Sequence, residues 1–469
     1  MPLILGTNSI KDTGYEVANS CRFNKADTPS LSITPGSNGS NTVWTISMWC
    51  KRSNLSDGSN DQKIHAAGTS STYELLFSTA DQLTLYNGST TVFVTNRKFR
   101  DVSGWYHIVV AYNTGASGND RCKVYINGTQ ETSFATDNRD DGSAMNHINQ
   151  SVAQFVGNNN AGDGFDGYIA EVCVIDGTAY AASSFGEFNE DSPQIWQPID
   201  VSELTFGTNG AYFDFESSGN LGNDANGGTD WAENNIAATD QATDTPTNNF
   251  ATLNPLNVPT SNAPTFKEGS LETESATTSG QRFMGSSTIG LTAGKWYAEC
   301  KIVVIDSATV GISPDVAVHA KDNTYIGSHA HDWSILPDSG NKYTDNLGTT
   351  HGDAFSANDI LMIALDIDNL NVYFGHNGNW FDGSGNADEA APNSALSLTA
   401  PASTPEQAYF FACSDGGGSA KVKVQWNFGN PPFSISSGNS DANGYGNFEY
   451  AVPSNYFSLC TKNLAEYGG

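Results

Sequence analysis

Two pairs of carboxylates stand at alternate positions of strand-like segments, a spacing that would place both members of a pair on one face of a strand. The pairs are Asp214 with Glu216, and Asp366 with Asp368. Retaining glycosidases use two carboxylates about 5 Å apart. The alternative is that these acids end strands and face solvent. We prefer this alternative and expect no enzymatic activity, because the sequence has no phosphate-binding loop, dinucleotide fingerprint, GxSxG elbow or HExxH motif.

Several histidines fall in one polar part of the sequence. They are His319, His329, His331 and His351, with Asp332 next to one of them. On a strand, His329 and His331 would point to the same face and form a metal-binding pair. The spacing does not identify a third ligand, and histidines in a polar loop commonly form surface hydrogen bonds instead, which is the alternative that we prefer. We keep His329 and His331 as candidate ligand-binding residues.

The loop DGSGNADE, residues 382–389, alternates side chains that carry oxygen. The candidate calcium ligands are Asp382, Ser384, Asn386 and Asp388. Calcium takes about six to eight oxygen ligands, and the glycines would let the loop fold around an ion. Asp163 and Asp166 form a weaker case of the same kind. The alternative is an ordinary acidic hairpin loop, so we expect no required cofactor and consider calcium as the ion that this loop would bind.

Exposed aromatic side chains recognise sugars, because their apolar faces stack on pyranose rings while polar neighbours form hydrogen bonds. Trp333, Tyr343 and Trp380 lie in or beside polar segments and are the candidates for this role. The alternative is that a tryptophan in such a segment closes the end of a β-sandwich.

Length and charge bound the class of protein. The chain has 469 residues, too many for one hydrophobic core, so at least two domains are expected. It contains 21 Lys and Arg against 51 Asp and Glu, a net charge of −30. Such a surface repels phosphate, so we expect no nucleic-acid binding. The sequence contains 47 glycines, and its short apolar runs are separated by turn residues. This pattern is typical of an all-β protein.

Cysteine usage and the N-terminal segment bear on the compartment. The seven cysteines have no paired spacing, and several lie inside apolar runs, so we expect free buried thiols. The segment MPLILGTNSIKDTG has no basic stretch and only a short apolar run, and no later segment is apolar enough to span a bilayer. We therefore expect synthesis in a reducing cytoplasm, with no signal peptide and no membrane insertion.

Strand-like segments follow one another at short, regular spacing over residues 20–215. In VWTISMWC (43–50) the apolar residues alternate with polar ones, which predicts a strand with one buried face. The motifs WTISMWCKR, GWYHIVVAY, KVYING and FDGYIAEVCV resemble the laminin-G/concanavalin-A-like family, in the order expected there. The resemblance implies a jelly-roll sandwich of lectin or glucanase type, although the Glu-x-Asp-x-x-Glu strand of such glucanases is missing. The stretch 175–198 that follows resembles the version of this domain in phage virion proteins.

The second half is organised around FSANDILMIALDIDNLNVYFGHNGNWF (355–381). Two apolar strands separated by turns rich in Asn and Gly predict a hairpin, because these residues accept positive φ. The segment resembles the central strands of SPRY domains, and VKVQWNFGNPPF (422–433) resembles the family's closing motif. The resemblance covers about residues 266–462. It departs from the family over 322–346, where SPRY domains choose their ligands, so it implies no particular partner.

We therefore predict an all-β chain with two tandem antiparallel β-sandwiches, the first jelly-roll or concanavalin-A-like and the second SPRY-like. The expected segments are an N-terminal arm (1–19), the first sandwich (20–215), an extended Asn/Thr/Pro-rich linker (216–265), the second sandwich (266–462) and a C-terminal tail (463–469). The linker is expected to be extended because proline fixes φ and blocks helices.

Two binding-type sandwiches without a catalytic constellation predict a display or adhesion protein. Such proteins work outside cells, and a bacteriophage virion protein, made in the host cytoplasm and released by lysis, needs no signal peptide. We predict a non-enzymatic virion surface protein, a tail fibre or receptor-binding adhesin that recognises host surface glycan. Its partners would be other virion proteins, a host glycan or receptor, and further copies of itself, as in a trimer. The alternatives are a head fibre, capsid decoration or connector protein, a glycan depolymerase that uses the first sandwich, and a cellular protein whose SPRY loops bind a peptide.

Overall fold

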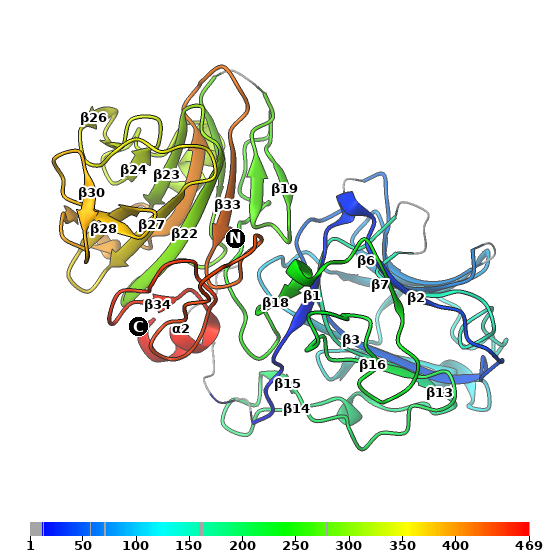
Figure 1. Cartoon of the computed structure of the whole chain (residues 1–469). Coiled ribbons are helices and arrows are strands. Elements are labelled where there is room, and N and C mark those ends of the chain that lie inside the picture. The colour runs from blue at the N-terminus through cyan, green and yellow to red at the C-terminus, as the bar shows by residue number, and fades with distance from the viewer. Residues whose placement is uncertain are drawn as a thin grey trace. The chain divides into compact units, whose positions relative to one another are not determined.

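The computed structural model describes residues 12, 14–56, 58–69, 72–158, 163–277 and 280–468. The chain divides into two compact units between Thr247 and Asn248. The regular secondary structure of both units is mostly antiparallel strands (Figure 1). The prediction of an all-β chain with two sandwiches is confirmed.

The first unit, residues 14–247, contains two large sheets with a shared core. One sheet has the strand order β10-β9-β8-β3-β13-β1-β18, with β16 paired to β13, and the other has the order β11-β7-β6-β5-β4-β12-β2-β17. The strands are β1 (Ser20–Phe23), β2 (Ser30–Ile33), β3 (Val43–Arg52), β4 (Gln62–Ala67), β5 (Tyr73–Phe77), β6 (Gln82–Asn87), β7 (Thr90–Lys98), β8 (Tyr106–Asn113), β9 (Cys122–Ile126), β10 (Thr129–Gln130), β11 (Phe134–Asp137), β12 (Gln154–Val156), β13 (Gly167–Asp176), β14 (Gly186–Phe188), β15 (Trp196–Pro198), β16 (Ala211–Phe213), β17 (Ala232–Asn234) and β18 (Gln241–Ala242). Short 3-10 turns are η2 (Lys25–Asp27), η3 (Gly118–Arg121), η4 (Ala182–Ser184) and η5 (Ala238–Asp240).

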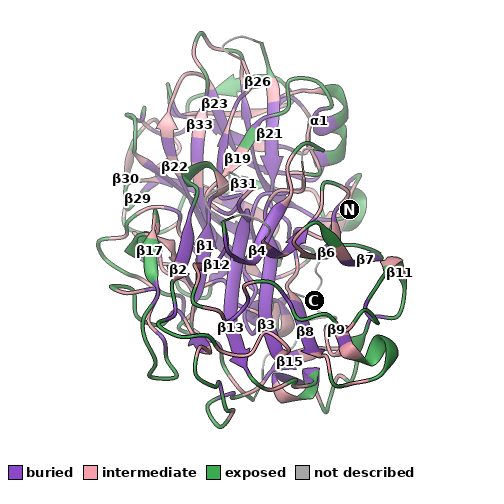
Figure 2. Cartoon of the chain, turned by 90° about the vertical axis from the view of Figure 1, so that its right-hand side faces the viewer, coloured by how far each residue is buried: buried purple, intermediate pink, exposed green. Residues whose placement is uncertain are grey.

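Period-two alternation explains how β3 is placed. Trp44, Ile46, Met48 and Cys50 point into the core shared by the two sheets, as their spacing predicts. The residues between them are buried as well, because Val17 and the segment that contains Trp196 cover the other face of this sheet. Figure 2 shows β3 and β13 buried over almost their whole length. Both faces of the central strands are therefore covered by protein.

The structure corrects the prediction of an extended linker over residues 216–265. Strand β17 pairs with β2, and β18 pairs with β1, so residues 216–247 complete both sheets of the first unit, while residues 248–265 belong to the second unit. Asp244 is buried, accepts a hydrogen bond from Trp105 Nε1 at 3.1 Å, and forms an ion pair with Lys51 Nζ at 2.6 Å. The Asn/Thr/Pro-rich composition conceals this, because one buried aspartate with two distant partners leaves no local sequence pattern.

The second unit, residues 248–468, has a sheet of order β19-β20-β33-β22-β27-β28-β29-β30 and a sheet of order β21-β32-β23-β24-β25-β26. Strands β31 and β34 pair with β28 and β22. The strands are β19 (Thr265–Lys267), β20 (Glu272–Glu274), β21 (Arg282–Ser286), β22 (Lys295–Val304), β23 (Ala308–Ser313), β24 (Trp333–Leu336), β25 (Asn341–Thr344), β26 (Leu347–Thr349), β27 (Ile360–Asp366), β28 (Asn371–His376), β29 (Asn379–Phe381), β30 (Ala387–Glu389), β31 (Leu396–Ser397), β32 (Phe410–Asp415), β33 (Lys423–Asn427) and β34 (Phe457–Ser458). The helices are α1 (Val316–Asp322), α2 (Thr461–Tyr467) and the 3-10 turn η6 (Pro401–Ser403).

The hairpin predicted from residues 355–381 is present. Strands β27 and β28 pair from Leu361 opposite His376 to Asp366 opposite Asn371. The turn between them requires a φ of 55° at Leu370, and the next turn uses Asn377 at 46° and Gly378 at 94°. Asn and Gly tolerate these values, which explains why the second turn was visible in the sequence.

The structure describes the C-terminal end of the chain to residue 468 but little of the N-terminal end. Most of the predicted N-terminal arm, residues 1–11 and 13, lies outside the described residues. At the C-terminal end, α2 packs Leu464 into the core of the second unit and stacks Tyr467 on Phe457 with ring centroids 3.9 Å apart, so most of the predicted tail (463–469) is part of that unit. Neither helix in the described residues has the length and apolarity needed to cross a bilayer.

Candidate functional site

A surface pocket lies where β8 and β9 meet the turn at residues 179–181 of the first unit. Its volume is about 410 Å³, within the range of about 300–1,000 Å³ found for ligand pockets. It is lined by Ala111, Asn113, Ala116, Ser117, Asp120, Lys123, Tyr125, Ala179, Tyr180 and Ala181. We call this set of residues the outer-face pocket.

Strand alternation places these side chains on the face away from the main core. In β9, the core residues are Cys122, Val124 and Ile126, so Lys123 and Tyr125 point the other way. In β8, Val110 and Tyr112 face the core, which leaves Ala111 and Asn113 to line the pocket. The outer-face pocket is therefore a consequence of the period-two pattern of two adjacent strands.

The pocket combines small apolar, aromatic and charged groups. Tyr125 and Tyr180 are half-buried, and both rings pack against apolar residues behind them. The Tyr180 hydroxyl accepts a hydrogen bond from Thr205 N at 3.3 Å, which helps to hold the turn. Lys123 Nζ lies 3.3 Å from Asp120 Oδ1; the Asp120 side chain is exposed and the Lys123 side chain is partly buried. Two fixed tyrosines, alanines and a charged pair are the groups that a sugar ring and its hydroxyls need.

A second pocket of about 350 Å³ lies at the rim of the same unit. Residues 33–37, 207–210 and 226–231 line it, and its aromatic residue, Trp231, is buried in the core of the unit. We call it the rim pocket. It offers glycines, hydroxyls and amides, but its lining lacks an exposed ring on which a sugar could stack.

A buried serine and histidine near the first pocket do not form a nucleophilic pair. His107 Nδ1 accepts a hydrogen bond from Trp196 Nε1 at 2.9 Å, and an indole nitrogen can only donate. The ring therefore carries its proton on Nε2 and donates it to Ser47 Oγ, 2.9 Å away. A histidine that donates to a serine cannot remove that serine's proton, and burial lowers the pKa of His107 to about 3.

Glu171 of the first unit has a strongly raised pKa. It lies at a bulge in β13 with a φ of 50°, is almost fully buried, and accepts a hydrogen bond from Tyr212 Oη at 2.8 Å. Burial, reinforced by the negative charges of Asp214 and Glu216, raises its pKa to about 8. A buried, protonated carboxyl on a strained backbone occurs in acid catalysts, and it also occurs where it has only a structural role.

The carboxylate pairs predicted from spacing do not share a strand face. Strand β16 ends at Phe213, and Phe215 takes a φ of 59°, so Asp214 and Glu216 lie in a turn that Asp214 Oδ1 closes by accepting Glu216 N at 3.0 Å. In the other pair, Asp366 is buried in an ion pair with Lys295 Nζ at 2.7 Å. Asp368 is exposed and accepts a hydrogen bond from Gly294 N at 2.7 Å.

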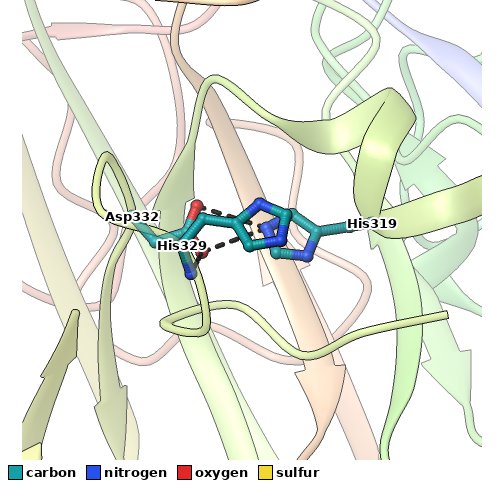
Figure 3. Close-up of side chains that lie close together, drawn as sticks. All are labelled: His319, His329 and Asp332. Carbon is teal, nitrogen blue, oxygen red and sulfur yellow. Dashed lines mark hydrogen bonds and ion pairs between the residues drawn. The ribbon is translucent and has the colours of Figure 1, made fainter. Parts of the chain in front are cut away.

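In the second unit, three side chains with metal-ligating atoms come together: His319, His329 and Asp332. Their ligand atoms lie within 4.8 Å of one another (Figure 3). His319 Nε2 lies 3.0 and 3.2 Å from the two oxygens of Asp332, and the rings of His319 and His329 stack with centroids 4.3 Å apart. Asp315 Oδ2 lies 3.5 Å from His329 Nδ1. We call these four residues the histidine cluster.

His329 and His331 do not lie on a strand, so their spacing does not place both rings on one face as a metal-binding pair. They lie in a turn, which Asp332 Oδ2 closes by accepting hydrogen bonds from Gly327 N at 2.9 Å and His329 N at 3.0 Å. His331 Nδ1 bonds to Thr399 Oγ1 at 3.2 Å instead of facing the ring of His329. The partner of His329 is His319, which α1 supplies from ten positions earlier in the chain.

The three predicted sugar-stacking aromatics are not brought together in one site. Trp333 and Tyr343 lie on paired strands β24 and β25 and are half-buried, and the Trp333 indole donates to Ser397 O at 2.9 Å. Trp380 is buried on β29, against Tyr297 and residues of the segment 448–456. The expectation of an exposed Trp380 is corrected, because a distant part of the chain covers that face of the sheet.

The predicted calcium loop is closed by its own hydrogen bonds. Asp382 Oδ1 accepts Ser384 N at 2.6 Å and Asn386 N at 3.1 Å, and its Oδ2 accepts Asn386 Nδ2 at 2.8 Å. These bonds hold the pKa of the exposed Asp382 down at about 2. Asp388 lies on strand β30, beyond the loop. The calcium prediction stays a prediction, since the arrangement is also that of an ordinary acidic turn.

Sequence reasoning missed Tyr125, Tyr180, Glu171 and Asp315. Tyr125 carried a local signal, because in CKVYI it alternates with the apolar residues and must face outward. Glu171 is a lone acid inside the apolar run YIAEVCVI, which also indicates a buried carboxyl. Tyr180 and Asp315 gave no local signal, because long-range packing decides their neighbours.

Comparison with known proteins bears mainly on the first unit. A family model described as the Concanavalin A-like lectin/glucanases superfamily matches residues 25–182. This match confirms the concanavalin-A-like fold that was predicted for the first sandwich. No curated protein matches the chain in sequence.

Several solved structures are similar to parts of the chain. The SPRY domain of human HERC1 is 16% identical over 37% of this chain and 96% of its own, with a TM-score of 0.27. The native heptameric SAP-like pentraxin from Limulus polyphemus is 14% identical over 36% of this chain and 80% of its own, with a TM-score of 0.27. Stonustoxin is 16% identical over 38% of this chain and 27% of its own, with a TM-score of 0.27.

Proposed function

We propose that this chain is a carbohydrate-binding protein whose first unit holds a sugar ring in the outer-face pocket. The observation that carries the proposal is the pairing of two half-buried tyrosines with an alanine-lined floor, inside a unit of concanavalin-A-like lectin fold. Packing behind Tyr125 and Tyr180 fixes their rings, so binding a sugar would cost little side-chain entropy. The sugar hydroxyls would form hydrogen bonds with the side chains of Asn113, Asp120 and Lys123.

The size of the pocket sets the expected affinity. One hexose has about twelve non-hydrogen atoms, and at about 0.3 kcal/mol per atom it would bind with about −4 kcal/mol. This corresponds to a Kd of about 1 mM. Linking several such sites in one oligomer would raise the avidity by about 10²–10⁴. The proposed homo-oligomer, such as a trimer, would therefore convert a weak sugar site into firm attachment to a glycan surface.

We further propose that the protein acts without catalysis on the surface of a bacteriophage particle, as a tail fibre or receptor-binding adhesin. This rests on the resemblance of residues 175–198 to a stretch of phage virion proteins. The net charge of −30 would keep such a protein soluble and away from packaged DNA. A head fibre, capsid decoration or connector would use the same two sandwiches as assembly modules. Immunoelectron microscopy of purified particles separates these locations from one another.

The test of carbohydrate binding is a glycan array probed with the full chain, beside the variants Tyr125→Leu and Tyr180→Ala. Leucine keeps apolar volume behind the pocket but removes the flat ring. Both variants are expected to lose at least nine-tenths of the signal on the glycans that the natural chain retains. The matched control is Asn226→Ala in the rim pocket, which should bind like the natural chain. Equal binding by all variants would contradict the proposal, and a loss confined to Asn226→Ala would move the site to the rim pocket.

One observation favours a second candidate, a glycan depolymerase. Burial raises the pKa of Glu171 to about 8, so the carboxyl is protonated at neutral pH, as a general acid must be. Asp214 and Glu216 are close enough to raise this pKa further by their negative charge. This candidate predicts release of reducing ends from the glycans retained on the array, and loss of that release in Glu171→Gln. Binding without any release of reducing ends would exclude it.

A further inference from the structure

We propose that the histidine cluster of the second unit is a site for a divalent transition-metal cation such as Zn²⁺, with His319, His329 and Asp332 as ligands and Asp315 as the fourth. The site lies in the second unit and is independent of the proposed sugar site. Imidazole nitrogens and carboxylate oxygens in this ratio are typical of zinc and related first-row ions, whereas calcium sites use oxygen alone.

The arrangement is held by the fold around it. His319 is fully buried on α1, and its ring lies between Phe283, at 5.9 Å, and His329, at 4.3 Å. Asp332 is fully buried and fixed by hydrogen bonds from the backbone nitrogens of Gly327 and His329. The His329 side chain is 30% exposed, which gives an ion a route from solvent. Two of the four ligand groups, His319 and Asp332, are thus held in place by the fold.

Charge balance supports a cation at this place. Asp315 and Asp332 are both buried, and their ion-pair partners in the described part of the chain are the histidines of the cluster. A divalent cation would offset the charge of two carboxyl groups that are buried close together.

Both ring nitrogens of His319 form hydrogen bonds, and these bonds show which proton must move when a metal binds. His319 Nε2 donates to Asp332, while Nδ1 accepts from Thr324 Oγ1 at 2.7 Å. For Nε2 to bind a metal, the proton must move to Nδ1, and Thr324 must turn from donor to acceptor. No proton is lost from the imidazole, and both nitrogens stay satisfied. Thr324 is then the outer hydrogen-bond partner that orients a metal-bound histidine, and it is a positioning residue.

The test uses the full chain without an affinity tag, dialysed against a chelator. Zn²⁺ is titrated calorimetrically and in thermal melts, with Ca²⁺ and Mg²⁺ as comparison ions. We expect one Zn²⁺ site per chain and a rise in the melting temperature, with no such effect of the comparison ions. Co²⁺ in the same site is expected to give the visible absorption of a four-coordinate ion. Failure of Zn²⁺ to bind, or an equal response to Ca²⁺, would overturn the proposal.

Variants assign the ligands. His329→Ala removes a partly exposed side chain and should weaken Zn²⁺ binding at least tenfold, while Thr324→Val should weaken it severalfold. His331→Ala is the matched control two positions away, because His331 bonds to Thr399 and should leave the affinity within twofold. The metal-free melting temperature of each variant, read in the same titration, separates loss of the site from loss of the fold. Unchanged affinity in His329→Ala would refute the assignment.

Discussion

Replacing Glu171 by glutamine tests the electrostatics of the first unit. The folded pKa of Glu171 is about 8 against an ordinary value of 4.5, because the carboxyl is buried beside Tyr212. Glutamine has nearly the same shape, can still accept the Tyr212 hydrogen bond, and has no proton to lose. The backbone strain at φ 50° is the same for both side chains and cancels in the comparison.

The sign of the pH effect follows from proton linkage. Between pH 4.5 and pH 8 the folded chain keeps a proton on Glu171 that the unfolded chain has lost, so stability falls as pH rises through this window. Each unit of pKa corresponds to about 1.4 kcal/mol, which sets a ceiling of roughly 5 kcal/mol. Roughly 3 to 4 kcal/mol of this is lost between pH 5 and pH 8. The natural chain should therefore carry a penalty at pH 8 that Glu171→Gln lacks.

Urea unfolding of both proteins from pH 5 to pH 9 measures this difference, because the midpoint and slope give the free energy of unfolding. The two curves should agree within about 1 kcal/mol at pH 5. At pH 8, Glu171→Gln should be more stable by about 3 kcal/mol. Glu203→Gln, which changes an exposed carboxyl in the same unit, is the control and should follow the natural chain. Parallel curves for the natural chain and Glu171→Gln would refute the assignment of a buried, protonated carboxyl.

Three further outcomes follow from the packing. Lys51→Met leaves the buried carboxylate of Asp244 without its cation and should destabilise the first unit by about 3–5 kcal/mol in urea unfolding; a change under 1 kcal/mol would contradict the buried ion pair. Gly311→Ala would place a Cβ 2.0 Å from Trp333 O, so the second unit should lose about 1–3 kcal/mol or more in the same assay, whereas a neutral result would contradict the pairing of β23 with β24. All seven cysteines are buried as free thiols, so a thiol reagent should modify fewer than one per native chain and all seven in denaturant; fast modification of the native chain would contradict their burial.

Local patterns explain which parts of the fold could be predicted. Alternation in β3 and the Asn-Gly turn before β29 are encoded within a few residues, so the hairpin and the buried face could be predicted from the sequence alone. Burial of the cysteines was visible for the same reason, because several lie inside apolar runs.

The parts that could not be predicted depend on contacts between distant segments. Trp380 is buried because the chain returns after position 440 to cover β29, and the residues next to Trp380 give no sign of this distant contact. A metal-binding pair of His329 and His331 would need an extended strand, but a turn closed by Asp332 separates them, and His319 from α1 stacks on His329 instead. Alternation predicts a shared face only when the backbone is extended, and the side chain of Asp332 prevents that here.

The central claim is that a sugar ring lies between Tyr125 and Tyr180. The most direct measurement is a crystal structure of the full chain with the glycan that binds best on the array. The account predicts density for one pyranose ring in the outer-face pocket, stacked on a tyrosine and hydrogen-bonded to Asp120 or Lys123. A glycan bound in the rim pocket or on the second unit, with the outer-face pocket holding only water, would contradict it.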